Sequence, residues 1–195
     1  GNIEDGDALG RIVHEAGGKY IMGCNPMALA VMKTPAEYGA DIAGGDGQPL
    51  GMPLAFGGPY LGLMTATAAM TRKLPGRIVG ETADHEGRRA FVLTLQAREQ
   101  HIRREKASSN VCSNQAWCAL TASVYMTAMG ADGMAKAAGQ CMSKAHYLRD
   151  VLKEAGLEPK HNCEFFHEFV TVSPEGGCTD SAHILRALES KGILG

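Results

Sequence analysis

Residues 44–62, GGDGQPLGMPLAFGGPYLG, place the narrowest limits on the architecture of this chain. Seven of these nineteen residues are glycine and three are proline, so the segment predicts a long, turn-rich loop. Its only ionisable side chains belong to Asp46 and Tyr60, and it contains no lysine, cysteine, histidine or serine. The loop therefore has the composition of a binding segment that lacks a reactive group.

Two interpretations of this loop follow from the residues alone. One is a structural connection rich in turns. The other is an anion site in which Phe56, Gly57 and Gly58 offer backbone N–H groups to a phosphate or a carboxylate. Motifs of nucleophile elbows, dinucleotide-binding loops and P-loops are absent from the sequence.

The segments around the loop alternate between helical and extended patterns. Apolar spacing predicts helices near 7–16 and 27–34. Short apolar runs predict strands at 20–24, 40–43 and 61–66. This alternation predicts an α/β layered domain with a largely buried sheet. Ligands in such domains bind at the carboxyl ends of strands, where this loop would lie.

The second half of the sequence is mainly helical. A polar hairpin tip is expected at 84–89, and a charged helix at 95–106. A boundary near residue 130 separates a sheet domain, 1–130, from a smaller helix-and-strand domain, 131–195. The elements expected on either side of that boundary are helices at 112–129 and 132–155, a strand at 168–172 and a final helix at 179–190.

Composition excludes several classes of function. The net charge of −2 does not suggest nucleic acid or a membrane surface as a partner, and no apolar run is long enough to span a bilayer. We expect a protein of the bacterial cytoplasm, or of the mitochondrial matrix if the source is eukaryotic. The six cysteines are widely spaced, so reduced thiols are expected. The blunt first residues and the apolar end suggest a fragment of a longer chain.

Two further clusters carry chemistry-bearing side chains. The first is basic and holds Arg98, His101, Arg103 and Arg104; it is either a solvated helix face or a surface that docks an anion or a partner. The second combines His161, Cys163 and His167 beside two phenylalanines, for which a structural role is favoured over a metal site.

Several long runs of this sequence closely resemble the P-protein of the glycine cleavage system, a glycine dehydrogenase (decarboxylating). The resemblance extends over essentially all 195 residues and is to the first subunit, or to the N-terminal half of single-chain forms. The runs that carry it are residues 37–42, 45–51, 56–62, 75–82 and 95–106.

The resemblance implies a fold-type I pyridoxal-phosphate architecture, in which this chain forms the end of the large domain and a truncated small α+β domain. In the family's catalytic half, the same loop carries the lysine that forms a Schiff base with the cofactor. Gln48 occupies that position here, and an amide nitrogen cannot form an imine. The resemblance is therefore to the non-catalytic half, with no cofactor expected on this chain alone.

The complete enzyme implied by the resemblance decarboxylates glycine and passes the aminomethyl group to the lipoyl group of H-protein. Its partners would be the catalytic subunit or half, which binds pyridoxal phosphate covalently, and H-protein. We expect Phe56, Gly57 and Gly58 to help hold the partner's cofactor phosphate. The basic residues 98–104 would lie at the subunit interface or at the substrate-facing mouth. A stand-alone pyridoxal-phosphate enzyme and a structural interaction module are the alternatives.

Overall fold

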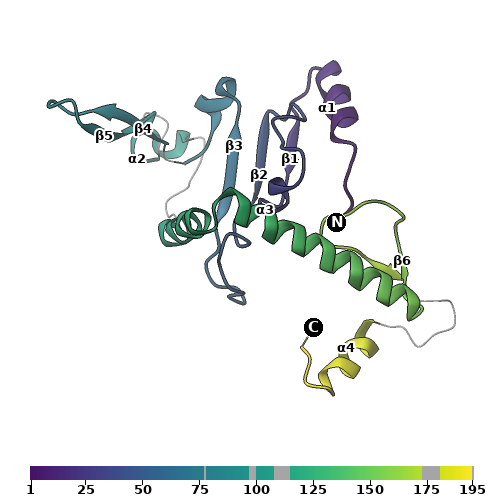
Figure 1. Cartoon of the computed structure of the whole chain (residues 1–195). Helices are drawn as coiled ribbons and strands as arrows, with labels where there is room; N and C mark the ends of the chain where they lie inside the picture. The colour runs from purple at the N-terminus through teal and green to yellow at the C-terminus, as the bar shows by residue number, and fades with distance from the viewer. Residues whose placement is uncertain (77, 97–99, 108–114, 173–180, 195) are drawn as a thin grey trace. The chain divides into compact units, whose positions relative to one another are not determined.

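The computed structural model of this chain describes residues 1–76, 78–96, 100–107, 115–172 and 181–194. The chain divides into two compact units. One comprises Gly6–Gly130, and the other comprises Ala131–Gly195 together with Gly1–Asp5. In Figure 1 the first unit is coloured purple to teal, and most of the second is green to yellow.

The first unit begins with a helix and continues with strands and short 3₁₀ helices. Helix α1 (Gly6–Glu15) carries Asp7 in its first turn and His14 in its last, which suits the helix dipole. The elements that follow are β1 (Ile21–Gly23), η1 (Ala28–Ala30), β2 (Ile42–Asp46), β3 (Gly62–Ala66), η2 (Ala68–Lys73), β4 (Ile78–Ala83), β5 (Arg89–Thr94), α2 (Gln100–Arg103) and η4 (Arg104–Lys106).

Strands β1, β2 and β3 form a sheet with β2 in the middle (Figure 1). β2 runs parallel to β1, with Ile42 opposite Ile21, and antiparallel to β3, with Asp46 opposite Gly62. The loop between β2 and β3 is therefore held at both ends by strand pairing. This topology places the glycine-rich segment at the carboxyl end of β2.

The other end of β2 is anchored by the carboxylate of Asp41, which is only 13% exposed. It accepts hydrogen bonds from Lys19 Nζ at 2.9 Å and from the Tyr20 N–H at 3.0 Å. His14 Nε2 lies 2.9 Å from its second oxygen. Lys19, then His14, then the Tyr20 N–H hold the pKa of Asp41 well below its usual range. These contacts tie α1 and the start of β1 to β2.

Strands β4 and β5 form a separate antiparallel hairpin, with Ile78 opposite Thr94 and Ala83 opposite Arg89. Its turn is closed by Asp84, whose carboxylate accepts the backbone N–H groups of Arg88 and Glu86, each at 2.9 Å. The Arg88 backbone donor, which is the strongest of these influences, lowers the pKa of Asp84. The Asp84 side chain in this polar tip therefore closes the hairpin turn.

Helix α3 (Ala116–Glu154) leads from the first unit into the second and is interrupted at Gly130, where φ is 62° and ψ is 179°. Helices expected to end at 129 and to start again at 132 correspond to the two halves of α3. The second unit also contains β6 (Glu158–Pro159) and β7 (Thr171–Val172), which pair antiparallel, and α4 (Ser181–Glu189).

Phe165 lies at the centre of the second unit and is 3% exposed. The imidazole of His146 stacks on its ring with centroids 4.1 Å apart, and Nε2 lies 2.9 Å from its carbonyl oxygen. Asn2 forms a β-bridge with the same residue, and the Ile3 N–H donates to the Glu164 carbonyl at 2.8 Å. These bonds explain why the first five residues belong to this unit.

Three expectations about the elements need correction. The sheet is not largely buried, because Ala43 is the only buried residue in β1, β2 and β3. The other elements of this chain leave much of the surface of this sheet exposed to solvent. β2 does not end at residue 43 but continues to Asp46, since pairing with β3 extends into the glycine run. The charged helix does not begin at 95, because Leu95 has a φ of 55° and α2 starts at Gln100.

Candidate functional site

The loop after β2 starts with a turn organised by Asp46. Its side chain accepts the backbone N–H of Gln48 at 2.7 Å, which is an Asx-type turn. The Gly47 N–H donates across the loop to the Leu61 carbonyl at 2.6 Å. The Asp46 carboxylate therefore stabilises the backbone turn at the start of the loop.

Gln48 lies at the position where the resemblance implies a lysine in the catalytic half. Its side-chain Nε2 donates to the Met52 carbonyl at 2.7 Å, and the Met52 N–H donates back to the Gln48 carbonyl at 3.2 Å. Between them, Leu50 is only 4% exposed. The amide of Gln48 therefore closes a turn, a role that the sequence did not indicate.

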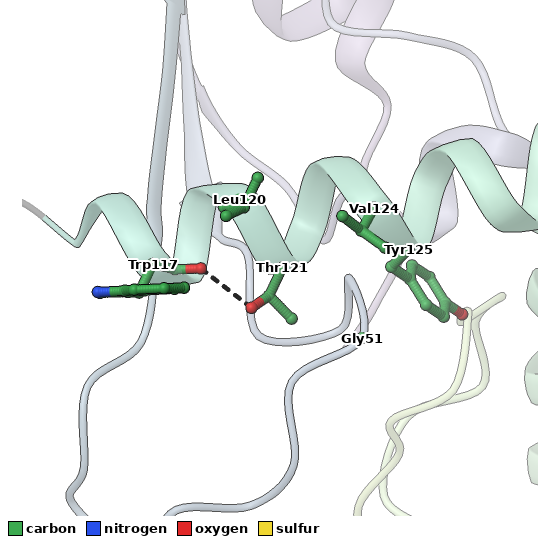
Figure 2. A pocket seen from close by; sticks show the side chains of 6 residues that line it. All are labelled: Gly51, Trp117, Leu120, Thr121, Val124 and Tyr125. Atoms are coloured by element: carbon green, nitrogen blue, oxygen red, sulfur yellow. Dashed lines mark hydrogen bonds between the residues drawn. The ribbon is translucent and has the colours of Figure 1, made fainter.

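Gly51 brings this turn against helix α3. Its φ is +85°, and a Cβ placed on it would lie 2.7 Å from the Cβ of Tyr125. Beside this contact is a hollow of about 410 Å³ (Figure 2). The residues lining the hollow are Gly51, Trp117, Leu120, Thr121, Val124 and Tyr125.

The second part of the loop projects into solvent. Phe56 is 95% exposed and has a φ of 44°, which is unusual for a residue with a side chain. An internal hydrogen bond stabilises this segment: the Ala55 N–H donates to the Tyr60 hydroxyl at 2.8 Å. The Cys118 thiol of α3 lies 3.6 Å from the Pro59 carbonyl. An exposed aromatic ring on a braced turn is typical of a contact segment.

The backbone donors of the expected anion site are not equivalent. The Gly58 N–H already donates to the Ala55 carbonyl at 2.9 Å. The N–H groups of Phe56 and Gly57 have no acceptor in the described part of the chain. The structure thus leaves two of the three predicted donors available to a ligand.

The described residues of the basic cluster lie on two short helical segments that follow the β4–β5 hairpin. His101 and Arg103 belong to α2 and Arg104 to η4, and all three side chains are exposed. No hydrogen bond between the loop and either His101 or Arg104 is present within the described ranges. Arg98 lies outside the described residues, so its predicted role stays a prediction.

The lysine nearest to the loop in sequence on its N-terminal side is engaged elsewhere. Lys33 Nζ lies 2.5 Å from the Asp7 carboxylate and 4.5 Å from the centroid of the Tyr38 ring. Its hydrogen bond to Asp7 raises the pKa of Lys33. A more persistently protonated amine is a poorer nucleophile for imine formation. The geometry gives no support to Lys33 as a cofactor lysine.

The cysteines and the cluster of His161, Cys163 and His167 form no disulfide and no metal site in the part of the chain that the structure describes. Cys24, Cys118, Cys141 and Cys163 are free thiols, and burial raises the pKa of Cys24. No group of three metal-ligating side chains occurs among the described residues, His161 and Cys163 included. None of the helices described there is long and apolar enough to cross a membrane.

Sequence comparison extends the likeness over nearly the whole chain. Residues 1–194 match the family described as glycine cleavage system P-protein. The chain is 48% identical over its whole length to the probable glycine dehydrogenase (decarboxylating) subunit 1 of Chlorobium luteolum. It is 53% identical to the corresponding protein of Moorella thermoacetica over 171 residues, which are 87% of this chain.

A solved structure has a closely similar backbone. The crystal structure of glycine decarboxylase (P-protein) of the glycine cleavage system, in inhibitor-bound form, matches 99% of this chain with a TM-score of 0.92 and 43% identity. The chain belongs to the glycine cleavage system P-protein family. The family predicted from the sequence is therefore confirmed.

This chain spans less than half the length of the relatives it matches. It covers 44% of the Chlorobium luteolum protein, 38% of the Moorella thermoacetica protein and 44% of the crystallised chain. More than half of each relative therefore has no counterpart in these 195 residues.

Proposed function

We propose that this chain is part of the non-catalytic half of a glycine decarboxylase of the glycine cleavage system. The complete enzyme decarboxylates glycine and passes the aminomethyl group to the lipoyl group of H-protein. In this proposal residues 6–130 belong to a fold-type I large domain, and residues 131–195 together with 1–5 belong to the small domain. The observation that carries it is Gln48, whose amide closes a turn with Met52 in a loop without any amine.

Covalent attachment of pyridoxal phosphate does not fit this loop. Attachment requires an amine nucleophile, and residues 44–62 contain none. The Nε2 of Gln48 is an amide nitrogen that already donates to the Met52 carbonyl at 2.7 Å. In the assembled enzyme the catalytic half would hold the cofactor, which when bound acts as an electron sink.

The exposed part of the loop supports a different role toward the catalytic half. The N–H groups of Phe56 and Gly57, which have no acceptor among the described residues, are suited to donate to an anion, because successive backbone N–H groups in a turn can form a concave anion site. We propose that they contact the phosphate of the cofactor held by the catalytic half. The Gly58 N–H would support this turn from within through its bond to Ala55.

The basic residues are proposed as a second contact surface, separate from the loop. His101, Arg103 and Arg104 are exposed and carry no apolar burial role. Arginine recognises carboxylates and phosphates through paired donors, so these residues suit a subunit interface or the mouth of the substrate site. The proposed partners are the catalytic subunit or half and the lipoyl H-protein.

The experiment combines a cofactor assay with an activity assay. The chain alone, mixed with pyridoxal phosphate, should give no visible imine band and no borohydride-stable lysine adduct. Exchanged for the matching stretch of the Chlorobium luteolum subunit 1 and reconstituted with a catalytic P-protein subunit and H-protein, it should support glycine–bicarbonate exchange. An imine on the isolated chain would instead favour a stand-alone pyridoxal-phosphate enzyme. Failure to support exchange, despite correct folding, would indicate a structural module.

A further inference from the structure

The exposed end of the loop after β2 has two arms, which are attached to the fold in different ways. The trailing arm, residues 59–61, is held from outside at two carbonyl groups. The Pro59 carbonyl lies 3.6 Å from the Cys118 thiol of α3. The Leu61 carbonyl accepts the Gly47 N–H at 2.6 Å, and β3 begins directly after Leu61. The trailing arm is therefore fixed by α3, by the start of the loop and by the sheet.

The leading arm, residues 53–57, has no comparable hydrogen bond to α3 or to the sheet within the described ranges. Ala55 is the only residue of this arm that forms hydrogen bonds there. Its N–H donates to the Tyr60 hydroxyl at 2.8 Å, and its carbonyl accepts the Gly58 N–H at 2.9 Å. The Tyr60 hydroxyl is therefore the side-chain group through which the trailing arm holds the leading arm.

The turn between the arms has a sterically unfavourable backbone. Its ends are Ala55 and Gly58, and its central residues Phe56 and Gly57 have φ of 44° and 94°. Positive φ at both central positions is characteristic of a type I′ turn, which favours glycine or asparagine at the first of them. Phenylalanine is disfavoured there, so the conformation persists only where the surrounding structure holds it. The bond from Ala55 to the Tyr60 hydroxyl is such a constraint.

The same constraint determines where the backbone donors of the turn point. The N–H groups of Phe56 and Gly57 belong to the two peptide groups that follow Ala55, and neither has an acceptor among the described residues. Their directions are set by the backbone angles of Ala55 and Phe56. Donors that are already held in place bind an anion more tightly, because less conformational entropy is lost on binding.

We propose that Tyr60 is a positioning residue for the reaction. Its hydroxyl holds the turn of Phe56 and Gly57 so that their N–H groups receive the phosphate of the cofactor bound by the catalytic half. Tyr60 is half-buried and acts through Ala55, using an acceptor lone pair of its phenol oxygen. This inference rests on the proposed function and adds to it the group that keeps the two donors in place.

The first measurement follows the turn itself in the full 195-residue chain, by amide hydrogen exchange observed with NMR. Tyr60→Phe removes the hydroxyl and keeps the ring. The Ala55 N–H should then exchange at least about tenfold faster, because it has lost its acceptor. The Gly58 N–H should also exchange faster, since the turn that it closes is no longer held.

Tyr38→Phe is the matched control. Tyr38 is also half-buried and belongs to the same unit, and its hydroxyl forms no hydrogen bond in the described part of the chain. Its ring, which lies 4.5 Å from Lys33 Nζ, is kept by the substitution. Both amides should therefore exchange in Tyr38→Phe as in the wild type. Thermal unfolding followed by circular dichroism establishes that both variants are folded.

The second measurement separates the phosphate from the rest of the cofactor. The chain replaces the matching stretch of the Chlorobium luteolum subunit 1, and this hybrid is combined with a catalytic subunit. Pyridoxal phosphate and pyridoxal, which lacks the phosphate, are each titrated by the imine absorbance of the catalytic subunit. Tyr60→Phe should weaken the affinity for pyridoxal phosphate at least about tenfold and leave that for pyridoxal within about twofold. A general loss of structure would weaken both.

The outcomes distinguish the role of Tyr60 from the proposed function. Unchanged exchange of the Ala55 and Gly58 amides in Tyr60→Phe overturns the positioning role. Equal loss of affinity for the two cofactors, or no loss for either, overturns it as well. A wild-type hybrid that binds pyridoxal phosphate with its catalytic subunit but supports no glycine–bicarbonate exchange contradicts the function instead. In that case the amide exchange and the ratio of the two affinities still decide the role of Tyr60.

Discussion

The two parts of the loop after β2 use a similar composition for opposite purposes. In residues 47–52 the side chain of Gln48 closes a turn, Leu50 is buried and Gly51 contacts Tyr125. In residues 54–60 the apolar side chains face solvent, and Phe56 is 95% exposed. Glycine permits close packing in the first part and an open backbone in the second. Composition alone therefore does not distinguish an anchored turn from a solvent-exposed one.

The largest expected difference is between two leucines of this loop. Leu50→Ala should destabilise the first unit by about 2 to 5 kcal/mol, because it empties a buried site. Leu54 is 72% exposed, so Leu54→Ala should change stability by no more than about 0.5 kcal/mol. Urea unfolding followed by far-ultraviolet circular dichroism measures both. Equal effects would show that the first part is not anchored as described.

The next comparison uses two glycines with similar backbone angles. Gly51 and Gly57 have φ of 85° and 94°, so alanine at either position costs about 1 kcal/mol in backbone strain. Only at Gly51 would the new Cβ also meet Tyr125, which raises the expected cost to about 2 to 4 kcal/mol. Around Gly57 there is open space within 4 Å. Thermal denaturation should rank Gly51→Ala well below Gly57→Ala; the reverse order would contradict the packing.

A smaller effect is expected from the amide of Gln48. Gln48→Ala should cost about 1 kcal/mol by removing the donor to the Met52 carbonyl. Gln48→Glu should cost more, because a carboxylate would then face that carbonyl oxygen. The control is Gln96→Ala, whose amide donates to the Leu93 carbonyl at 3.1 Å in an exposed setting. If the two alanine variants unfold at the same urea concentration as the wild type, Gln48 has no closing role.

The smallest effect on stability should accompany the largest effect on function. Phe56→Ala should leave the free energy of unfolding within about 0.5 kcal/mol of the wild type, since the ring contacts solvent. In the reconstituted enzyme, we expect glycine–bicarbonate exchange to fall at least about tenfold if this turn helps to close the catalytic site. Leu54→Ala should retain exchange. Full activity of Phe56→Ala would remove the turn from the site.

Much of the local structure could be predicted from the sequence. Helix α1, the three sheet strands and the polar hairpin tip follow from apolar spacing and turn residues, which act over a few positions. The break in α3 at Gly130 follows from a residue type that readily leaves helical geometry. Burial could not be predicted in the same way. The apolar strands indicated a buried sheet, yet covering a sheet depends on segments that are distant in the sequence.

The family and the missing amine of the loop are properties of the sequence itself, because residue identity alone decides whether an imine can form. The sequence also marks α3 before Gly130 as a helix without charge. Only the tertiary structure shows that the Gln48 amide reaches Met52 and that Gly51 meets Tyr125. It also shows that, among the described residues, the N–H groups of Phe56 and Gly57 have no acceptor whereas that of Gly58 does. These facts depend on the path of the folded backbone, since hydrogen bonds and packing require atoms within a few ångströms of one another.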